Sequence, residues 1–239
     1  MCRLMGFVAT QETSLSTIAG YSFPQFAELA DRHKDGWGFS TDISLTKETS
    51  PARTSPRFEE AVDQKEKGAL LHFRFASTGI NVQETNSHPF SRDGVSFIHN
   101  GTIKPATTVD AFIAPDLLAS MTGTTDSERY FFAILTEARK SSYQDALLLT
   151  VRNIRATGNF SSLNSMLLTP DFYFVVSQHD NTRIPKDEPA DYYRLSYKVD
   201  KDGLVVASSG WDQAGWVEIP NQTMMVANRN NLELDFINI

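Results

Sequence analysis

Residues 2–9 read Cys-Arg-Leu-Met-Gly-Phe-Val-Ala, a short apolar run followed by polar turn residues. Such a run is typical of a buried β-strand over residues 3–9, and it leaves Cys2 at the mouth of that strand. Cys2 is the only cysteine in the chain. An internal disulfide and a cysteine-based metal cluster are therefore excluded, so any chemistry of this sulfur depends on Cys2 alone.

Apolar periodicity predicts both strands and helices in the rest of the chain. Further strands are expected at 36–40, 70–76, 95–103, 166–169, 172–178, 192–199, 203–208 and 222–228. Helices are expected at 23–33, 57–67, 107–121, 126–140 and 142–156, and residues 41–57, rich in Ser, Thr and Pro, are expected to form a loop or a lid. Because strands and helices come in runs rather than in strict alternation, we predict a layered, largely antiparallel α+β fold.

The composition is that of an ordinary globular protein, with 41% hydrophobic and 21% charged residues among 239. We therefore expect a single domain over residues 1–239. The formal net charge of -7 would repel a phosphate backbone, which argues against a nucleic-acid partner. No apolar run approaches the roughly 20 residues that cross a bilayer, and the first residues lack the pattern of a signal peptide. We expect no membrane partner and a cytoplasmic protein.

Several motifs have a purely structural explanation when each is taken alone. The Asn-Gly pair in the apolar run 97–103 is typical of a type I′ hairpin turn, and Thr-Asp-Ser-Glu at 125–128 is typical of a capping box. Residues 86–90 favour a turn before an extended segment. His72 and Arg74 would share one face of a strand, where a structural ion pair could explain Arg74.

The order and spacing of these motifs change their meaning. In chain order they are Cys2-Arg3-Leu4, Asp35-Gly36-Trp37-Gly38, Arg74-Phe75-Ala76-Ser77-Thr78-Gly79, Asn86-Ser87-His88-Pro89, His99-Asn100-Gly101 and Thr125-Asp126-Ser127-Glu128. This series resembles the successive signatures of the class II glutamine amidotransferases, and the run 33–38 is similar to that of their stand-alone bacterial members. The resemblance implies the N-terminal nucleophile (Ntn) hydrolase fold, a four-layer αββα sandwich with two mostly antiparallel sheets.

The resemblance also implies that Cys2 becomes the first residue once Met1 is removed, and that its thiol attacks a glutamine side-chain amide to form a glutamyl-thioester. An α-amino group has a pKa of about 7.7–8.0 and a cysteine thiol about 8.5, so a neutral terminal amine can take the thiol proton near neutral pH. The family's oxyanion hole corresponds to the Asn100 side-chain amide and the Gly101 backbone N–H.

The positions that bind substrate in the family can be carried over as well. Arg74 suits the α-carboxylate of glutamine, because a guanidinium binds it through two parallel hydrogen bonds, and Asp126 suits the α-ammonium. Ser77 and Thr78 fall where the family binds substrate, although Thr78 stands where histidine is common in the synthase members. His88 is expected to shape the pocket. The resemblance implies neither a cofactor nor a metal.

Four functions are compatible with these residues. The enzyme could hydrolyse L-glutamine and pass ammonia to a separate synthetase subunit, or it could cleave a γ-glutamyl amide in a small metabolite, as the related ergothioneine-pathway amidohydrolase does. A catalytically silent binding or regulatory module is an alternative of another class. A metal hydrolase would draw on His72, His88 and His99, but their spacing matches no standard zinc site.

Overall fold

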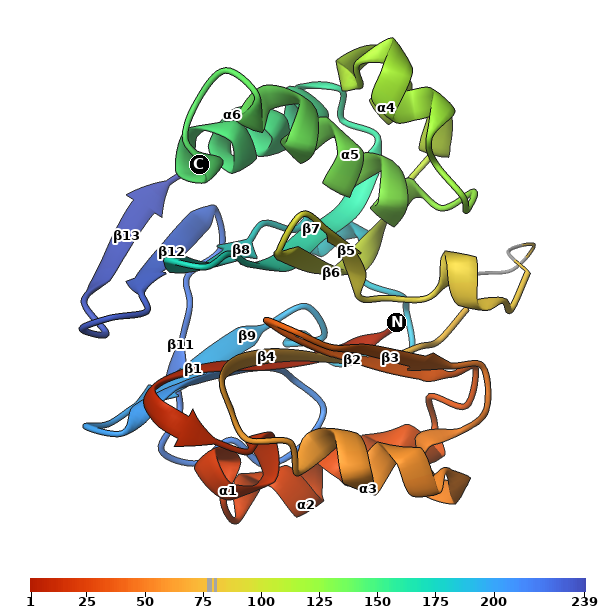
Figure 1. Ribbon diagram of the computed structural model, residues 1–239. Coiled ribbons are helices and arrows are strands. Elements are labelled where there is room, and N and C mark those ends of the chain that lie inside the picture. Colours follow the sequence, from red (N-terminus) through yellow and green to blue (C-terminus); the bar gives the residue numbers. More distant parts are fainter. Residues whose placement is uncertain (77–78, 80) are drawn as a thin grey trace.

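The computed structural model describes residues 1–76, 79 and 81–239. Within this part of the chain, two β-sheets lie face to face, and helices cover both outer faces (Figure 1). All strand pairs in both sheets are antiparallel. The four-layer αββα sandwich and the antiparallel α+β class expected from the sequence are therefore confirmed.

The two sheets have different strand orders. One sheet contains, in spatial order, β11 (Val217–Glu218), β9 (Leu195–Val199), β10 (Gly203–Ser208), β1 (Arg3–Thr13), β4 (Glu66–Phe73), β2 (Trp37–Thr41) and β3 (Leu45–Glu48). The other contains β13 (Leu234–Asn238), β12 (Thr223–Asn228), β8 (Phe172–Ser177), β7 (Phe160–Leu168), β6 (Val95–Ile103) and β5 (Phe90–Arg92). We call them the β1 sheet and the β6 sheet.

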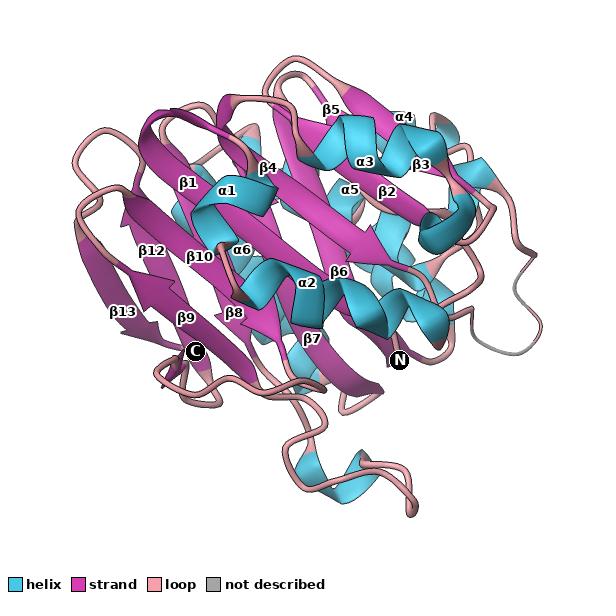
Figure 2. Ribbon diagram, turned by 90° about the horizontal axis from the view of Figure 1, so that it is seen from below, coloured by secondary structure: helices cyan, strands magenta, loops and turns pink. Residues whose placement is uncertain are grey.

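Helices close the outer face of each sheet. The β1 sheet is covered by α1 (Leu15–Ala19), α2 (Ser22–Ala27) and α3 (Pro56–Val62), which lie across its strands in Figure 2. The β6 sheet is covered by α5 (Asp126–Ala138) and α6 (Tyr143–Ala156), and α4 (Pro115–Ala119) packs against α5 (Figure 1). No helix in the described ranges is long and apolar enough to cross a membrane.

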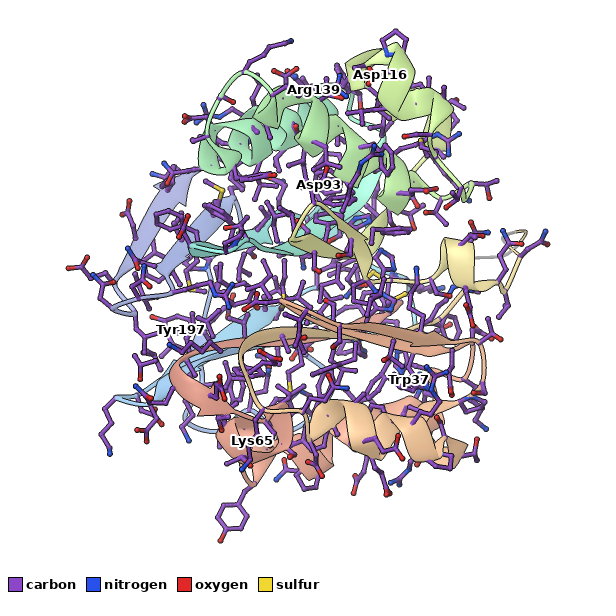
Figure 3. All side chains as sticks on the ribbon, in the orientation of Figure 1. Trp37, Lys65, Asp93, Asp116, Arg139 and Tyr197 are labelled. Carbon is purple, nitrogen blue, oxygen red and sulfur yellow. The ribbon has the colours of Figure 1, made fainter. Side chains whose placement is uncertain are left out.

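Strand β1 is buried on both faces, as its apolar sequence predicts. Leu4 and Val8 point into the core between the two sheets, whereas Met5 and Phe7 point into the core beneath the helices. This alternation follows from the two-residue period of a strand. Trp37 lies in the same outer core, between the β1 sheet and α3 (Figure 3). The first residues of β1 therefore hold Cys2 rigidly at the end of a central strand.

Some elements differ from the sequence prediction. The helix expected at 107–121 is broken into the 3₁₀ helix Ala106–Phe112 and α4, because Pro115 keeps Ala114 extended (ψ 140°). The loop expected at 41–57 contains the edge strand β3 and the 3₁₀ helix Ala52–Thr54. Strand β3 has little apolar signal because its Leu-Thr-Lys-Glu sequence lies half exposed at a sheet edge.

Element boundaries differ elsewhere. The helix expected at 57–67 ends at Val62, and the one expected at 23–33 ends in the 3₁₀ helix Glu28–Asp31. Strand β7 begins six residues before its expected start at 166, because its buried polar residues interrupt the apolar pattern.

The Asn-Gly pair at 100–101 does not form a hairpin. It lies within β6, where Asn100 pairs with Asn164 and Gly101 with Leu163. Neither residue has the positive φ that both central positions of a type I′ turn need. The hairpin prediction was wrong, because an Asn-Gly pair is only a local turn signal and strand pairing with β7 overrides it.

Candidate active site

The Cys2 side chain faces the segment that follows β4. Arg3 pairs with Phe73 in the β1–β4 ladder, so the residues beyond Phe73 run past Cys2. The Phe75 backbone N–H donates to the Cys2 Sγ atom at 3.4 Å, and Sγ lies 3.6 Å from the Phe75 carbonyl oxygen. The sulfur is therefore held by backbone from a residue more than seventy positions away.

This segment is itself held in place by residues 35 and 36. The Ala76 N–H donates to the Asp35 carboxylate at 2.8 Å, and the Arg74 N–H donates to the Gly36 carbonyl at 2.9 Å. Gly36 adopts φ +115°, which glycine tolerates best, and an added Cβ would overlap the Glu48 carbonyl oxygen. Asp35 and Gly36 thus position Arg74 and Phe75 rather than contacting the sulfur.

The local environment keeps the Cys2 thiol protonated. Burial raises the pKa of the Cys2 thiol, whereas the hydrogen bond from the Phe75 backbone and the charges of the N-terminus and Arg74 lower it. Because burial is the largest cause, the net shift is upward. A base that removes the thiol proton would be needed for Cys2 to react as a thiolate near neutral pH.

Arg74 is a buried guanidinium with spare donors. Its Nη1 and Nη2 atoms donate to the Ser87 hydroxyl at 3.4 Å and to the Asn81 carbonyl at 3.0 Å. Neither partner is a carboxylate, so within the described ranges the guanidinium does not form the structural ion pair considered from the sequence. Burial lowers the pKa of Arg74, but a guanidinium remains protonated at neutral pH. Its remaining donors suit an anionic ligand.

Asp126 lies at the first position of α5. Its carboxylate accepts the Ile103 N–H at 2.6 Å and the Ser127 N–H at 3.0 Å. These bonds leave acceptor positions on both oxygens, which suits a cationic ligand. The Thr125 side chain caps the helix by accepting the Glu128 N–H at 3.1 Å. The reciprocal half of the capping box is absent here, because the Glu128 carboxylate accepts from residues 122 and 123.

His99 connects β6 to the start of α5. Its Nε2–H donates to the Ser162 carbonyl at 3.0 Å, since a carbonyl can only accept, and its Nδ1 accepts from the Ser127 hydroxyl at 2.9 Å. Burial lowers the pKa of His99, which is consistent with this neutral form. His99 therefore sets the position of the α5 N-terminus relative to Gly101.

Asn100 and Gly101 lie on β6 across from Cys2. Both polar atoms of the Asn100 amide are buried without a hydrogen-bond partner in the described part of the chain. A Cβ on Gly101 would overlap the Ser162 carbonyl oxygen, so the close approach of β7 demands glycine at this position. The neighbouring strand thus occupies the space that a side chain at position 101 would fill.

His88 and His72 stack on each other, with ring centroids 4.2 Å apart and an interplanar angle of 31°. Burial lowers the pKa of both rings well below the ordinary value, so both are neutral. Gly38 permits this arrangement, because a Cβ there would overlap the His88 carbonyl oxygen. Among the described residues, no group of three or more His, Cys, Asp or Glu residues could hold a metal ion.

One pocket joins these segments at the end of the interface between the sheets, where the N-terminus lies (Figure 1). It is lined by Cys2, Arg74, Phe75, Ala76, Asn86, His88, His99, Gly101, Thr125, Asp126 and Ser127. The pocket includes the predicted residues Cys2, Arg74, His88, Gly101 and Asp126. Asn100 is buried beside it, whereas Ser77 and Thr78 lie outside the described residues.

The sequence prediction missed several residues of this wall, although most belong to the quoted motifs. Phe75 and Ala76 follow Arg74, and Ser127 follows Asp126. Asn86 begins its own motif, and its side chain accepts the Thr124 N–H at 2.9 Å, which joins the 86–88 segment to α5. These neighbours could have been proposed from their motifs, but only the fold shows which of them face the pocket.

The chain matches the family model described as "Glutamine amidotransferases class-II" over residues 1–232. It therefore belongs to the class II glutamine amidotransferases, and it is an enzyme. It is 26% identical over 234 residues to the probable glutamine amidotransferase DUG3 of Saccharomyces cerevisiae, a match that covers 87% of this chain. The chain spans 63% of the length of that relative.

Solved structures share the Ntn-type fold at low sequence identity. A glutamine aminotransferase class-II domain protein from Silicibacter pomeroyi superimposes with a TM-score of 0.68 and 16% identity, covering 100% of this chain and 99% of that one. The glutamine phosphoribosylpyrophosphate amidotransferase from B. subtilis superimposes with a TM-score of 0.63 and 17% identity, covering 99% of this chain and 49% of that one. At these identities the likeness shows the fold alone.

Proposed function

We propose that the enzyme hydrolyses the side-chain amide of glutamine, or of a γ-glutamyl compound, with Cys2 as the nucleophile after removal of Met1. One observation carries the proposal: the Cys2 sulfur shares a pocket with the Arg74 guanidinium and the Asp126 carboxylate, which come from distant parts of the chain. A nucleophile between opposite charges suits a substrate that carries both a carboxylate and an ammonium group. We further propose that residues 1–239 act as one amidotransferase domain.

The reaction begins with transfer of the thiol proton to the neutral α-amino group of Cys2. The sulfur then attacks the amide carbon, and the oxyanion of the tetrahedral intermediate accepts from the Asn100 amide and the Gly101 N–H. The Asn100 amide has no partner among the described residues, and this supports the role, because a buried donor without a partner is costly unless a ligand uses it. The amine returns the proton to the departing nitrogen, which leaves as ammonia or an amine.

The second half of the reaction releases glutamate. Water, activated by the same amine, attacks the glutamyl-thioester, and the sulfur leaves and recovers a proton. Throughout, Arg74 holds the α-carboxylate and Asp126 the α-ammonium of the glutamyl group. Ser77 and Thr78 are proposed to bind substrate only from their place in the family motif, and His88 shapes the pocket wall.

Two versions of this function differ in the leaving group. Ammonia would be used by a separate synthetase subunit, whereas a γ-glutamyl metabolite would release an amine without such a partner. Mass spectrometry of a panel of γ-glutamyl compounds incubated with the enzyme distinguishes them. If the enzyme consumes glutamine and none of the other compounds in the panel, the first version is supported. If it consumes a substituted γ-glutamyl amide faster than glutamine, the second version is supported.

The nucleophile is tested with three forms of the chain: the wild type, Cys2→Ala, and a variant with a lysine inserted between Met1 and Cys2. The insertion keeps the thiol but leaves its residue with a peptide nitrogen that has no basicity. We expect intact-mass analysis to show loss of Met1 and one adduct of an electrophilic glutamine analogue at Cys2 in the wild type. Neither altered form should turn over glutamine.

Fully active enzyme that retains Met1 would contradict the proposal, as would full activity of the insertion variant. Labelling of Cys2→Ala at another residue would assign the nucleophile elsewhere. A silent binding module would bind glutamine without consuming it, and a metal hydrolase would lose activity in chelator. Circular dichroism should show that Cys2→Ala keeps the fold, because its thiol makes only weak backbone contacts.

A further inference from the structure

His33 lies directly beside the peptide bond that joins Met1 to Cys2. It follows the 3₁₀ helix Glu28–Asp31 and is only 5% exposed. Its Nε2 atom is 2.7 Å from the Met1 carbonyl oxygen, and its Nδ1 atom is 2.5 Å from the Leu29 carbonyl oxygen. Its ring also meets the Phe75 ring edge-on, with centroids 5.9 Å apart. The imidazole is thus fixed on three sides.

The two carbonyl oxygens cannot both be satisfied by a neutral histidine. A neutral imidazole has one N–H donor and one acceptor nitrogen, whereas a carbonyl oxygen can only accept. A charged imidazolium would satisfy both, but burial lowers the pKa of His33 to about 4. A neutral imidazole near neutral pH can therefore donate to only one of these two carbonyl oxygens.

Removal of Met1 resolves the conflict. The Leu29 carbonyl stays in place, so Nδ1 keeps the proton and Nε2 presents its lone pair toward Cys2. The Met1 carbonyl oxygen disappears, and the nitrogen that remains on Cys2 lies within about 2.5 Å of the position that oxygen occupied. This nitrogen is now an amine with N–H donors. It can reach Nε2 directly after a small movement, or through one bridging water.

We propose that His33 is a positioning residue for the α-amino group of processed Cys2: its neutral Nε2 accepts from the amine and directs the amine lone pair toward the sulfur. The inference rests on the proposed function, because it concerns the amine that acts there as the base. His33 does not contact the substrate. It acts through the amine by restricting rotation about the Cys2 N–Cα bond.

The groups around this end of the chain are indicated by those that act on the α-amine of Met1, the residue that precedes Cys2. In the chain with Met1, burial is the main cause that lowers the pKa of the terminal amine, and Arg3 and Arg32 lower it further. Glu188 and Cys2 raise the pKa of the Met1 amine, and the Tyr192 hydroxyl lies 2.8 Å from the Met1 nitrogen. A neutral acceptor beside the processed amine favours its protonated form, so loss of His33 should lower the pKa of this amine.

The test compares substitutions that keep or remove the acceptor. His33→Gln can place an oxygen near the position of Nε2, His33→Asn reaches only the Leu29 side, and His33→Phe keeps the ring without any acceptor. His179→Phe is the control, since His179 is a half-buried histidine that stacks on Tyr193 at 5.4 Å, outside the pocket. All variants are produced as fusions whose cleavage leaves Cys2 first, so that Met1 removal does not depend on His33.

We expect His33→Phe and His33→Asn to lower kcat for glutamine by about ten- to a hundredfold, as for a lost hydrogen bond to a charged group, with KM unchanged. The acidic limb of kcat/KM should move to lower pH in both. His33→Gln should recover most of kcat, and His179→Phe should behave as wild type. If His33→Phe does not fold, the comparison of His33→Asn with His33→Gln still decides.

Two results separate failure of this inference from failure of the proposed function. If the wild type loses Met1 and is labelled at Cys2, but His33→Asn keeps the wild-type kcat and acidic limb, the role of His33 is overturned and the nucleophile stands. If the wild type is fully active with Met1 in place, the nucleophile proposal fails and the role of His33 fails with it.

Discussion

Asn100 and Asn164 lie opposite each other on β6 and β7, and both are buried, yet in the described ranges only the Asn164 side-chain amide has hydrogen-bond partners. The Asn164 Nδ2 donates to the Tyr193 carbonyl at 2.5 Å, and its Oδ1 accepts the Gln178 N–H at 2.9 Å. One amide of the pair supports the fold. The other amide has both polar atoms without a partner in the part of the chain that the structure describes, as expected of a group that binds a ligand.

This pair predicts opposite effects of the same substitution. Asn100→Ala should lower kcat by about 10²–10³-fold, as for other oxyanion donors, with little loss of stability beyond the cavity it leaves. Asn164→Ala leaves the same cavity, but it also leaves the Tyr193 carbonyl and the Gln178 N–H without their partner. It should therefore lower the free energy of unfolding by about 1–3 kcal/mol more than Asn100→Ala does. Urea denaturation and steady-state kinetics measure both. Equal destabilisation with unchanged kcat for Asn100→Ala would contradict the assignment.

Gly101→Ala should damage both stability and activity. The new methyl group would overlap the Ser162 carbonyl oxygen, so β6 and β7 must separate, at a cost of about 1–3 kcal/mol or more. Gly68→Ala is the matched control on β4, because the nearest atom there is Nη2 of the Arg229 side chain, at 2.9 Å. Thermal unfolding should rank Gly101→Ala as the less stable variant. If Gly68→Ala were the less stable variant, the close approach of β6 and β7 at Gly101 would be contradicted.

Arg74→Lys should raise KM for glutamine by about ten- to a hundredfold, because a single ammonium cannot rebuild a two-pronged contact with a carboxylate. Arg139→Lys is the control. Arg139 makes such a contact with Asp116 at 2.6–2.9 Å, but this exposed pair lies among the outer helices, far from the N-terminus (Figures 1 and 3). If Arg74→Lys leaves kcat and KM for glutamine unchanged, the assignment of Arg74 to the glutamine site is wrong.

Stability should fall as the pH is lowered from 7.5 to 5.5. Burial lowers the pKa of His33 to about 4, and that of His72 and His88 well below the ordinary value of about 6.5. Below pH 6.5 the unfolded chain takes up protons that the folded chain does not. The free energy of unfolding should then decrease by up to about 1.4 kcal/mol per pH unit for each such histidine.

Urea denaturation at the two pH values measures this decrease. The range lies well above the pKa of Asp116, which Arg139 lowers to about 2, so that carboxylate does not contribute. His72→Leu should show a smaller decrease than the wild type, because it removes one titrating group. Equal or greater stability at pH 5.5 would show that these histidines are not held neutral.

Many local elements were predictable from the sequence. The strand expected at 203–208 coincides with β10, and the helix expected at 142–156 begins one residue late as α6. These segments have a clear apolar period and distinct turn or capping residues at their ends. The segment 45–48 was not predictable, because an exposed edge strand needs no apolar residues and its pairing with β2 is made by backbone groups.

The same distinction holds for the site. The order of motifs indicated the class of enzyme and five residues of the pocket wall, whose roles remain predictions. It could not indicate that Asn100 and Gly101 lie within a strand, or that His33 faces the Met1 carbonyl oxygen.

Short-range patterns specify elements because side-chain periodicity depends only on neighbours along the chain. Contacts such as that of Cys2 with Phe75, or of Asp126 with Ile103, join residues that are remote in sequence. Their distances arise from the packing of two whole sheets against each other, a property of the complete tertiary structure that no single segment contains.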